Sequence, residues 1–194
     1  MLFVLMILHN ILDRKWYLGL FKGKYTLMRF FRTAINILLL ASFLCVAVSA
    51  VFLSSTLSSL FHLKAAMLGR RMHMVFTAWS FVLMSDHVGL HWNMMIAMIN
   101  KRIIKQKHQD CVAAKFSTLL IVVYGLYAFL SRELPQRMFL WNEYSFFNYN
   151  ESILECFIDY FSILWLFSFF AYCVIKTISS RKEVSVYGGD SMGN

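Results

Sequence analysis

Two histidines in one apolar stretch, RRMHMVFTAWSFVLMSDHVGLHW, are the residues of this chain best suited to do chemistry. They are His73 and His87, fourteen residues apart. In an α-helix this spacing places two side chains on nearly the same face, about 21 Å apart along the axis. Imidazole is costly in hydrocarbon unless a partner or a metal satisfies it. Because imidazole is a common axial ligand of haem iron, haem is the first metal group to consider.

The composition indicates an integral membrane protein. Of the 194 residues, 59% are hydrophobic, 15% are charged and one is proline, which is too apolar for a soluble domain of this size. We predict an all-α, polytopic transmembrane helix bundle with four full spans plus a partial N-terminal helix. The expected spans are 33–61, 71–99, 116–134 and 153–177. The opening run is too short to cross about 30 Å of hydrocarbon before Asp13. We expect one cytochrome-like domain over 1–178 and a short, disordered cytoplasmic tail over 179–194.

The distribution of basic residues predicts the topology. Lysine and arginine gather before the first span, between the second and third spans and after the last one, so these segments are expected on the cytoplasmic side. The other two connections should face outward. We read the basic residues as topology signals and expect no nucleic-acid partner. The basic residues that carry this prediction are Arg14, Lys15, Lys22, Lys24, Arg29, Arg32, Lys101, Arg102, Lys105, Lys107, Lys115, Lys176, Arg181 and Lys182.

This topology assigns a depth to each histidine. His9, on the partial first helix, and His87 both lie near the cytoplasmic surface, so they meet the requirement for ligating one haem from two facing helices. His73 lies at the outer level without a partner, and we expect its missing partner upstream of Met1 or on another chain. His91 shares a face with His87. It can replace His87 as ligand, bind a haem propionate or cap the site edge, and we favour a supporting role beside the ligand.

Other residues constrain the chemistry. The four cysteines form no CxxC and no CxxCH, which argues against covalent haem attachment and against a zinc or iron–sulfur site. We expect Gly89 and Ala78 to give a flat macrocycle room to approach. Glu155 or Asp159 should pair with Arg132 or Arg137. Each intramembrane histidine also has a simpler interpretation as a hydrogen bonder between helices.

Three segments together resemble a known family. They are LMILHNILDRKWYLGLFKGKYT, RRMHMVFTAWSFVLMSDHVGLHWNMM and VVYGLYAFLSREL, and the likeness to the flavinylation-associated cytochrome domain family covers most of the chain. Its most specific elements are LH followed by DRKWY and the HxGLHW turn. The resemblance implies His9, His73 and His87 as axial ligands of haem iron, and His91 as a neighbour in the cofactor-binding site. The family pattern also includes an N-terminal helix with an HEWLG-like motif, which this chain lacks.

The resemblance implies a small b-type cytochrome of the bacterial cytoplasmic membrane, holding one or two haem b groups. It would pass electrons across the membrane to an extracytosolic partner that carries FMN, receiving them from a cytoplasmic donor or from another membrane redox subunit. Bis-histidine iron has no open coordination site, so we expect an electron carrier rather than a stand-alone oxidoreductase. The alternative is a non-haem scaffold or transporter subunit in which the histidines form hydrogen bonds or relay protons.

Overall fold

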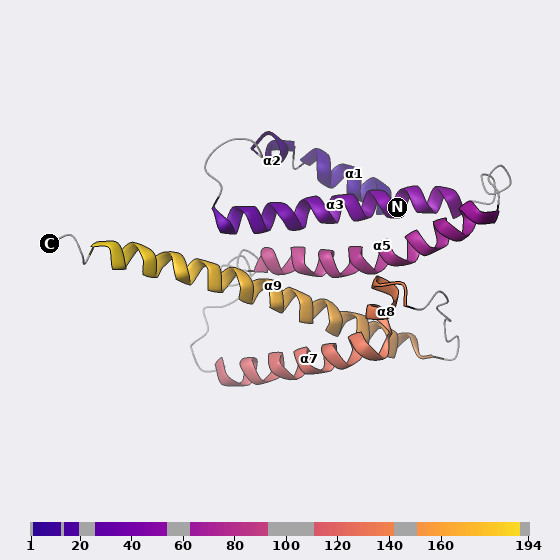
Figure 1. Ribbon diagram of the computed structural model, residues 1–194. Helices are drawn as coiled ribbons and strands as arrows, with labels where there is room; N and C mark the ends of the chain where they lie inside the picture. The colour runs from indigo at the N-terminus through magenta and orange to yellow at the C-terminus, as the bar shows by residue number, and fades with distance from the viewer. Residues whose placement is uncertain are drawn as a thin grey trace.

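The computed structural model describes residues 2–12, 14–19, 26–53, 63–92, 111–141 and 151–190. Within these ranges the regular structure is entirely helical. Four long helices pack side by side in the spatial order α3, α5, α9, α7, and each neighbouring pair is in contact (Figure 1). The short helices α1 and α2 flank α3 on its outer side, whereas α8 caps one end of the bundle. The helices are α1 (Leu2–Leu12), α2 (Arg14–Gly19), α3 (Leu27–Leu53), α5 (Leu63–Leu90), α7 (Cys111–Ser131), α8 (Leu134–Met138) and α9 (Ile153–Asp190).

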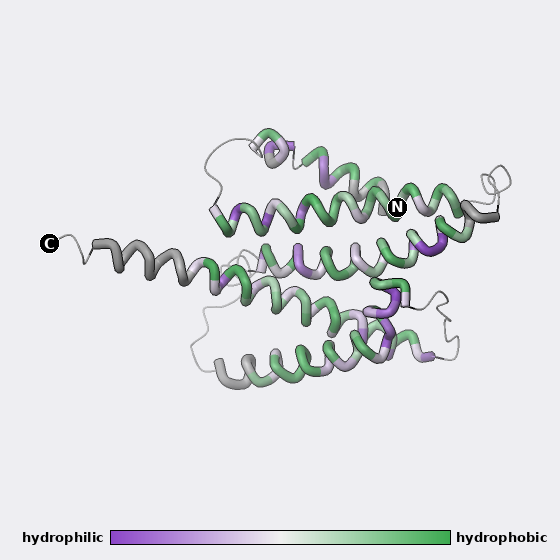
Figure 2. The backbone as a smooth tube through the Cα atoms, viewed as in Figure 1, coloured by the Kyte–Doolittle hydropathy of each residue, from purple (hydrophilic) through white to green (hydrophobic). Residues whose placement is uncertain are grey.

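Two of the long helices are long and apolar enough to cross a membrane. They are α3 and the Ile153–Ser179 part of α9, while Phe116–Ser131 within α7 is a shorter apolar helix. The predicted all-helical fold is therefore confirmed for the described residues, and membrane-spanning capacity is clear for two of the four expected spans. The strongly hydrophilic parts of the long helices lie toward the ends of the bundle (Figure 2).

The helix bounds differ from the expected spans in a systematic way. Helix α3 begins at Leu27 rather than at 33, and α5 begins at Leu63 rather than at 71, while positions 93–99 of the expected span lie outside the described residues. Hydropathy marks where a chain enters hydrocarbon, whereas backbone hydrogen bonding continues past that point. Arginines can stay in the first turns of α3 because their long side chains reach the interface while the helix continues.

The C-terminal segment also differs from the expectation. We predicted a disordered tail over 179–194, but α9 continues as a helix to Asp190. The sequence offers a reason, since no proline or glycine interrupts the segment before Gly188 and Gly189. Once nucleated within the membrane-length part of α9, the helix needs only ordinary helix-forming residues to extend.

Small residues bring the helices together. A side-chain carbon at Gly89 of α5 would lie 2.8 Å from the backbone Cα of Ser168 on α9, and one at Gly125 of α7 would lie 2.9 Å from the backbone carbonyl carbon of Ser162. Ser168 Oγ donates to the carbonyl oxygen of Ser85 at 2.7 Å. Close approach through glycine and serine is the packing mode of membrane helices.

The same contacts overturn one expectation about the site. Gly89 and Ala78 were predicted to leave room for a macrocycle, but the space beside Gly89 is occupied by the backbone of Ser168. Ala78 is 5% exposed and lies in a core cluster with residues of α7, α8 and α9. Both residues face α9, because the 3.6-residue period turns them away from the histidine face of α5.

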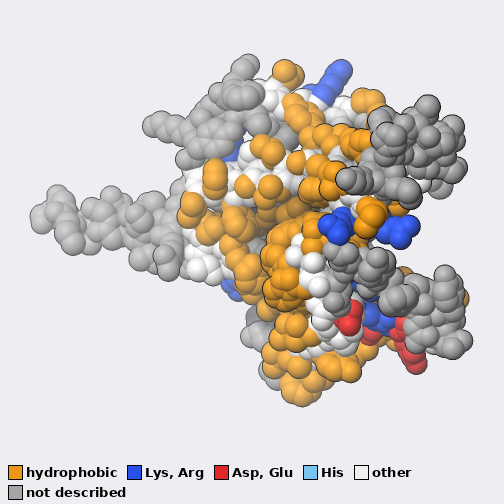
Figure 3. Space-filling view, turned by 45° about the vertical axis from the view of Figure 1, so that its right-hand side comes forward, with side chains coloured by type: hydrophobic (Ala, Val, Ile, Leu, Met, Phe, Trp, Pro, Cys, Tyr) orange, Lys and Arg blue, Asp and Glu red, His pale blue; other side chains and the backbone are white. Residues whose placement is uncertain are grey.

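The described surface is broadly apolar. Whole helix faces expose large hydrophobic side chains, among them Leu119, Val123, Leu126 and Leu130 of α7. Hydrophobic side chains cover much of the described surface, and the acidic side chains in view lie beside basic ones near one edge (Figure 3). Exposed apolar faces of this extent match a protein that is solvated by lipid.

Candidate functional site

His87 is held by α3. It lies in the last turn of α5, and its Nδ1 is 2.8 Å from Oδ1 of Asn36. An amide oxygen only accepts hydrogen bonds, so the ring donates through Nδ1–H. The neutral imidazole then keeps its lone pair on Nε2. A histidine whose tautomer is fixed by a hydrogen bond at one ring nitrogen can ligate a metal through the lone pair of the other.

His9 and His91 lie next to His87. The ring centroids of His9 and His87 are 6.3 Å apart with an interplanar angle of 85°. His91 follows the end of α5, and its ring centroid is 4.9 Å from that of His87. The structure therefore brings together three of the four predicted site residues, from α1 and from the C-terminal end of α5. His9 is exposed, so this cluster is open at its α1 side.

His73 lies at the other level of α5, and its partner comes from α3. Its Nδ1 is 3.1 Å from Oγ of Ser49, and Ser49 is fully buried. The serine hydroxyl carries a single hydrogen, which it donates to the carbonyl oxygen of Val46 at 2.8 Å. Oγ must therefore accept from the histidine, so Nδ1 of His73 also carries the hydrogen.

The two partners on α3 were missed by sequence reasoning. Asn36 and Ser49 are thirteen residues apart, nearly the spacing of His73 and His87, so an antiparallel pairing of α3 and α5 brings both pairs into register. A signal was present, because Asn36 is the one side-chain amide within α3. Polar side chains in an apolar membrane helix commonly mark a contact with another helix.

Polar contacts connect the α1–α2 segment. Tyr17 of α2 donates to Oδ1 of Asn10 on α1, and Arg29 of α3 donates to the carbonyl oxygen of Gly19. An open apolar groove of about 450 Å³ separates this segment from α3, lined by Ile7, Asn10, Ile11, Arg14, Tyr17 and Leu40. By helix periodicity the groove residues of α1 face away from His9, so the groove is not part of the histidine cluster.

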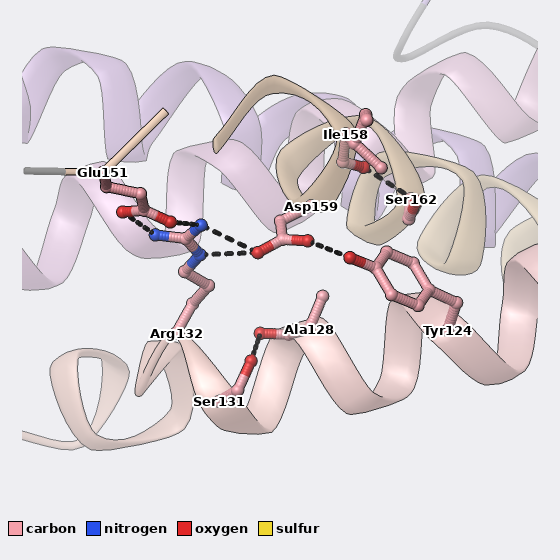
Figure 4. A network of polar contacts seen from close by, with 8 residues as sticks. All are labelled: Tyr124, Ala128, Ser131, Arg132, Glu151, Ile158, Asp159 and Ser162. Carbon is pink, nitrogen blue, oxygen red and sulfur yellow. Dashed lines mark hydrogen bonds and ion pairs between the residues drawn. The ribbon is translucent and has the colours of Figure 1, made fainter. Parts of the chain in front are cut away.

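A charged cluster occupies the opposite end of the bundle (Figure 4). The guanidinium of Arg132, just after α7, donates to both Glu151 and Asp159, with 2.8 Å to Asp159 Oδ2. Tyr124 donates to the other oxygen of Asp159 at 2.5 Å. The predicted pairing of Asp159 with Arg132 is confirmed. The hydrogen bonds from Arg132 lower the pKa of Glu151, and the same bonds raise the pKa of Arg132.

The remaining candidates add little to the site. Within the described ranges, no group of three or more histidine, cysteine, aspartate or glutamate side chains is arranged to hold a metal ion. Oδ1 of Asp86, next to His87 in sequence, is buried and has no hydrogen-bond partner among the described residues. Cys45, Cys156 and Cys173 are free thiols. The basic segment between α5 and α7, residues 93–110, lies outside the described residues.

No protein-family model matches this chain, and no curated protein or solved structure matches it either. The chemistry assigned to the histidines therefore rests on the geometry of these side chains.

Proposed function

We propose that this chain is a membrane-embedded b-type haem protein that passes electrons across the bilayer. The observation that carries the proposal is the pairing of His9 with His87 from two different helices. In the same proposal α5 and α7 span the membrane together with α3 and α9. The basic segments then face the bacterial cytoplasm, and the acceptor is an FMN-bearing protein outside.

The spacing of the two rings fits an iron ligated by two imidazoles. Metal–imidazole bonds are about 2.0–2.1 Å long, and each nitrogen lies about 1.1 Å from the centre of its ring. Two such ligands on opposite sides of one metal ion therefore have ring centroids about 6.2 Å apart. The centroids of His9 and His87 are 6.3 Å apart. The exposed side of His9 leaves a route by which a flat group can enter.

The neighbouring residues support the same ligand set. Asn36 accepts from Nδ1 of His87, which orients the ring and puts the lone pair on Nε2, the nitrogen that would ligate iron. His91 lies beside His87, where it can bind a propionate or substitute as ligand. When bound, haem would supply one-electron redox chemistry. The chain's own task is to hold the iron with two imidazoles in apolar surroundings, which leaves no coordination site for oxygen.

His73 is the remaining proposed ligand, at a second haem level. It lies about 21 Å from His87 along α5, and Ser49 holds it in the tautomer that ligates a metal. Two haem levels on one helix would span most of the hydrocarbon thickness. A second ligand for His73 would have to come from residues other than those described.

The test is the absorption spectrum of membranes that contain the full chain. Dithionite reduction should sharpen the haem bands, and His87→Ala should lose the haem at the cytoplasmic level. Asn36→Leu keeps both ligands but removes the acceptor for Nδ1, so haem affinity should fall about 10–100-fold. His108→Ala is the matched control, because the resemblance does not place His108 among the ligands. Colourless membranes would exclude the cytochrome function, and unchanged haem in His87→Ala would transfer the ligand role to His91.

A second function is favoured by a specific observation. Both His73 and His87 hydrogen-bond across the same helix pair, α5 and α3, and the ring spacing of His9 and His87 also lies in the range of ordinary aromatic contacts. A non-haem scaffold or transporter subunit needs only these contacts. In that case His87→Asn should change helix packing without changing any visible absorption.

A further inference from the structure

A cavity lies between α5, α7 and α9, apart from the histidine cluster. Its volume is about 190 Å³, and its lining residues are Trp92, Thr118, Trp165, Ser168, Phe169 and Tyr172. Trp92 stands just past the end of α5, and Thr118 lies in the second turn of α7. The cavity is therefore at the same end of the bundle as His87.

The cavity has the size of a single aromatic ring. A cavity of about 150 Å³ in a protein core is sufficient to bind benzene, and this one is larger. Two indoles form part of the wall, with the rings of Trp92 and Trp165 in edge-to-face contact at 4.9 Å and 87°. Such a wall favours a flat, apolar group that can pack against ring faces.

One polar group on the wall has no partner. Nε1 of Trp165 is buried and makes no hydrogen bond with the described residues. A buried N–H without an acceptor is destabilising, because the group has lost its hydrogen bond to water. By contrast, the Ser168 hydroxyl is already satisfied, since it donates to Ser85. A ligand that presents a carbonyl oxygen to Trp165 would remove this penalty, whereas a purely hydrocarbon ligand would not.

The surroundings indicate that such a ligand would enter from the lipid. Phe169 on the cavity wall is 39% exposed, and its neighbour Phe170 is 61% exposed. Both belong to the Ile153–Ser179 segment of α9, which can span a membrane. Lys176 follows Tyr172 by one helical turn, and its Nζ lies 6.0 Å from the centre of the Tyr172 ring. The rim of the cavity is therefore apolar at Phe169 and has a cation, Lys176, near the end of the membrane-length part of α9.

The cavity lies near the level of His87. Trp92 follows His87 by five residues and stands just past the end of α5, and five residues of helix rise about 8 Å along the axis.

We propose that this cavity binds the headgroup of a membrane quinone or quinol. The single-ring volume, the edge-to-face indoles, the unpaired N–H and the lipid-facing side each match a planar ring with carbonyl groups and an apolar tail. The role of this site as an electron entry point rests on the haem function proposed above. In that function, a quinol bound in the cavity would lose two electrons, one at a time, to ferric haem, release two protons to water and leave as the quinone.

Binding can be measured with duroquinone, a single-ring quinone, by titration calorimetry on the purified full chain. Trp165→Phe keeps the ring but removes the donor, so binding should weaken about tenfold. Thr118→Leu fills the cavity and should abolish binding. The matched control is Trp141→Phe. The Trp141 side chain is 73% exposed and is not part of the cavity wall, so this variant should bind duroquinone with the affinity of the wild type. Equal affinity in all three variants, or no binding by the wild type, would overturn the site.

A second measurement separates this proposal from the haem function. Duroquinol is mixed with the oxidised protein, and haem reduction is followed by stopped-flow absorption. Trp165→Phe should slow the reduction while its dithionite spectrum equals that of the wild type. If haem bands are seen but quinone binding does not depend on Trp165, the quinone site is wrong and the cytochrome function stands. If quinone binding depends on Trp165 but the protein is colourless, the quinone site stands and the cytochrome function is wrong.

Discussion

At the scale of single residues, the two histidines of α5 are oriented by the same kind of hydrogen bond. Each donates Nδ1–H to an oxygen on α3, His87 to Asn36 and His73 to Ser49. In both rings the hydrogen is therefore on Nδ1 and the lone pair on Nε2. This pattern suits metal ligation, and it also makes α3 and α5 a pair whose register is set by two polar contacts.

The positions of the histidines could be predicted from sequence, but their hydrogen-bond partners could not. Fourteen residues of helix fix where His73 and His87 lie relative to each other, because helix geometry is regular. Which neighbouring helix supplies the acceptor depends on packing between segments far apart in the sequence. The depth argument placed His9 near His87, whereas nothing in it distinguished Asn36 from the other polar residues of α3.

The Ser49 contact can be tested without reference to any cofactor. Ser49→Ala leaves Nδ1–H of His73 without its serine acceptor. It should lower the free energy of unfolding by about 0.6 kcal/mol, the average for hydrogen bonds between membrane helices, and by at most about 1.7 kcal/mol. Ser42→Ala is the matched control. Ser42 is also buried and also donates to a carbonyl oxygen of its own helix, that of Leu39. Denaturation by SDS in mixed micelles measures both variants, and equal losses would contradict the proposed hydrogen bond.

At the scale of helices, α9 is the element to which both α5 and α7 pack. It meets α5 at Gly89 and α7 at Gly125, in both cases backbone against a glycine. Sequence reasoning placed all four long helices but interpreted Gly89 as room for a cofactor. A glycine in a helix shows only that something approaches closely, and the identity of that neighbour is a property of the assembled bundle.

Gly89→Ala tests the crossing of α5 and α9. The added methyl group would overlap the backbone of Ser168, which cannot move aside as a flexible side chain would. The two helices must separate, so the variant should lose about 1–3 kcal/mol of stability. Gly19→Ala is the control, because no described residue lies within 4 Å of a side-chain carbon at that position. Its stability should stay within about 0.5 kcal/mol of the wild type. Unfolding of the two variants in the same detergent gives the comparison, and a stable Gly89→Ala would exclude the close contact.

The ion pairs of Arg132 connect the end of α7 to the start of α9, and they predict a pH dependence. Arg132 holds the pKa of Glu151 below its usual value of 4.5, so the folded state binds this proton less readily than the unfolded chain. The stabilisation is therefore complete above pH 4.5 and is lost as the pH falls through the lowered pKa.

Glu151→Gln should consequently be less stable than the wild type at pH 7, and this difference should shrink below pH 4.5. Thermal unfolding between pH 7 and pH 3 measures it. Glu155→Gln, at an exposed carboxylate four residues further along, should leave the pH dependence of the wild type unchanged. A difference between Glu151→Gln and wild type that stays constant over this range would show that the ion pair does not stabilise the fold.

At the scale of the whole molecule, the question is how many helices cross the bilayer. By length and hydropathy, α3 and the Ile153–Ser179 part of α9 are able to cross a membrane. The spatial order α3, α5, α9, α7 places α5 between those two helices, in contact with both. If α3 and α9 lie within the membrane, α5 packs against both at the same depth, so it too must lie within the hydrocarbon. The polar residues that weaken its hydropathy include His73 and His87, each of which has an oxygen partner on α3.

Labelling of single cysteines distinguishes four spans from two. In a background without the native cysteines, Trp141→Cys reports on the connection after α8, and Gln109→Cys on the connection between α5 and α7. With four spans, an impermeant maleimide should label position 141 in intact cells and position 109 only after permeabilisation. With α3 and α9 as the two spans, both connections lie on the outer side and both cysteines react in intact cells. Only the four-span topology places the level of His9 and His87 at the cytoplasmic side. Labelling of position 109 in intact cells would therefore contradict both the four-span topology and the proposed electron transfer across the membrane.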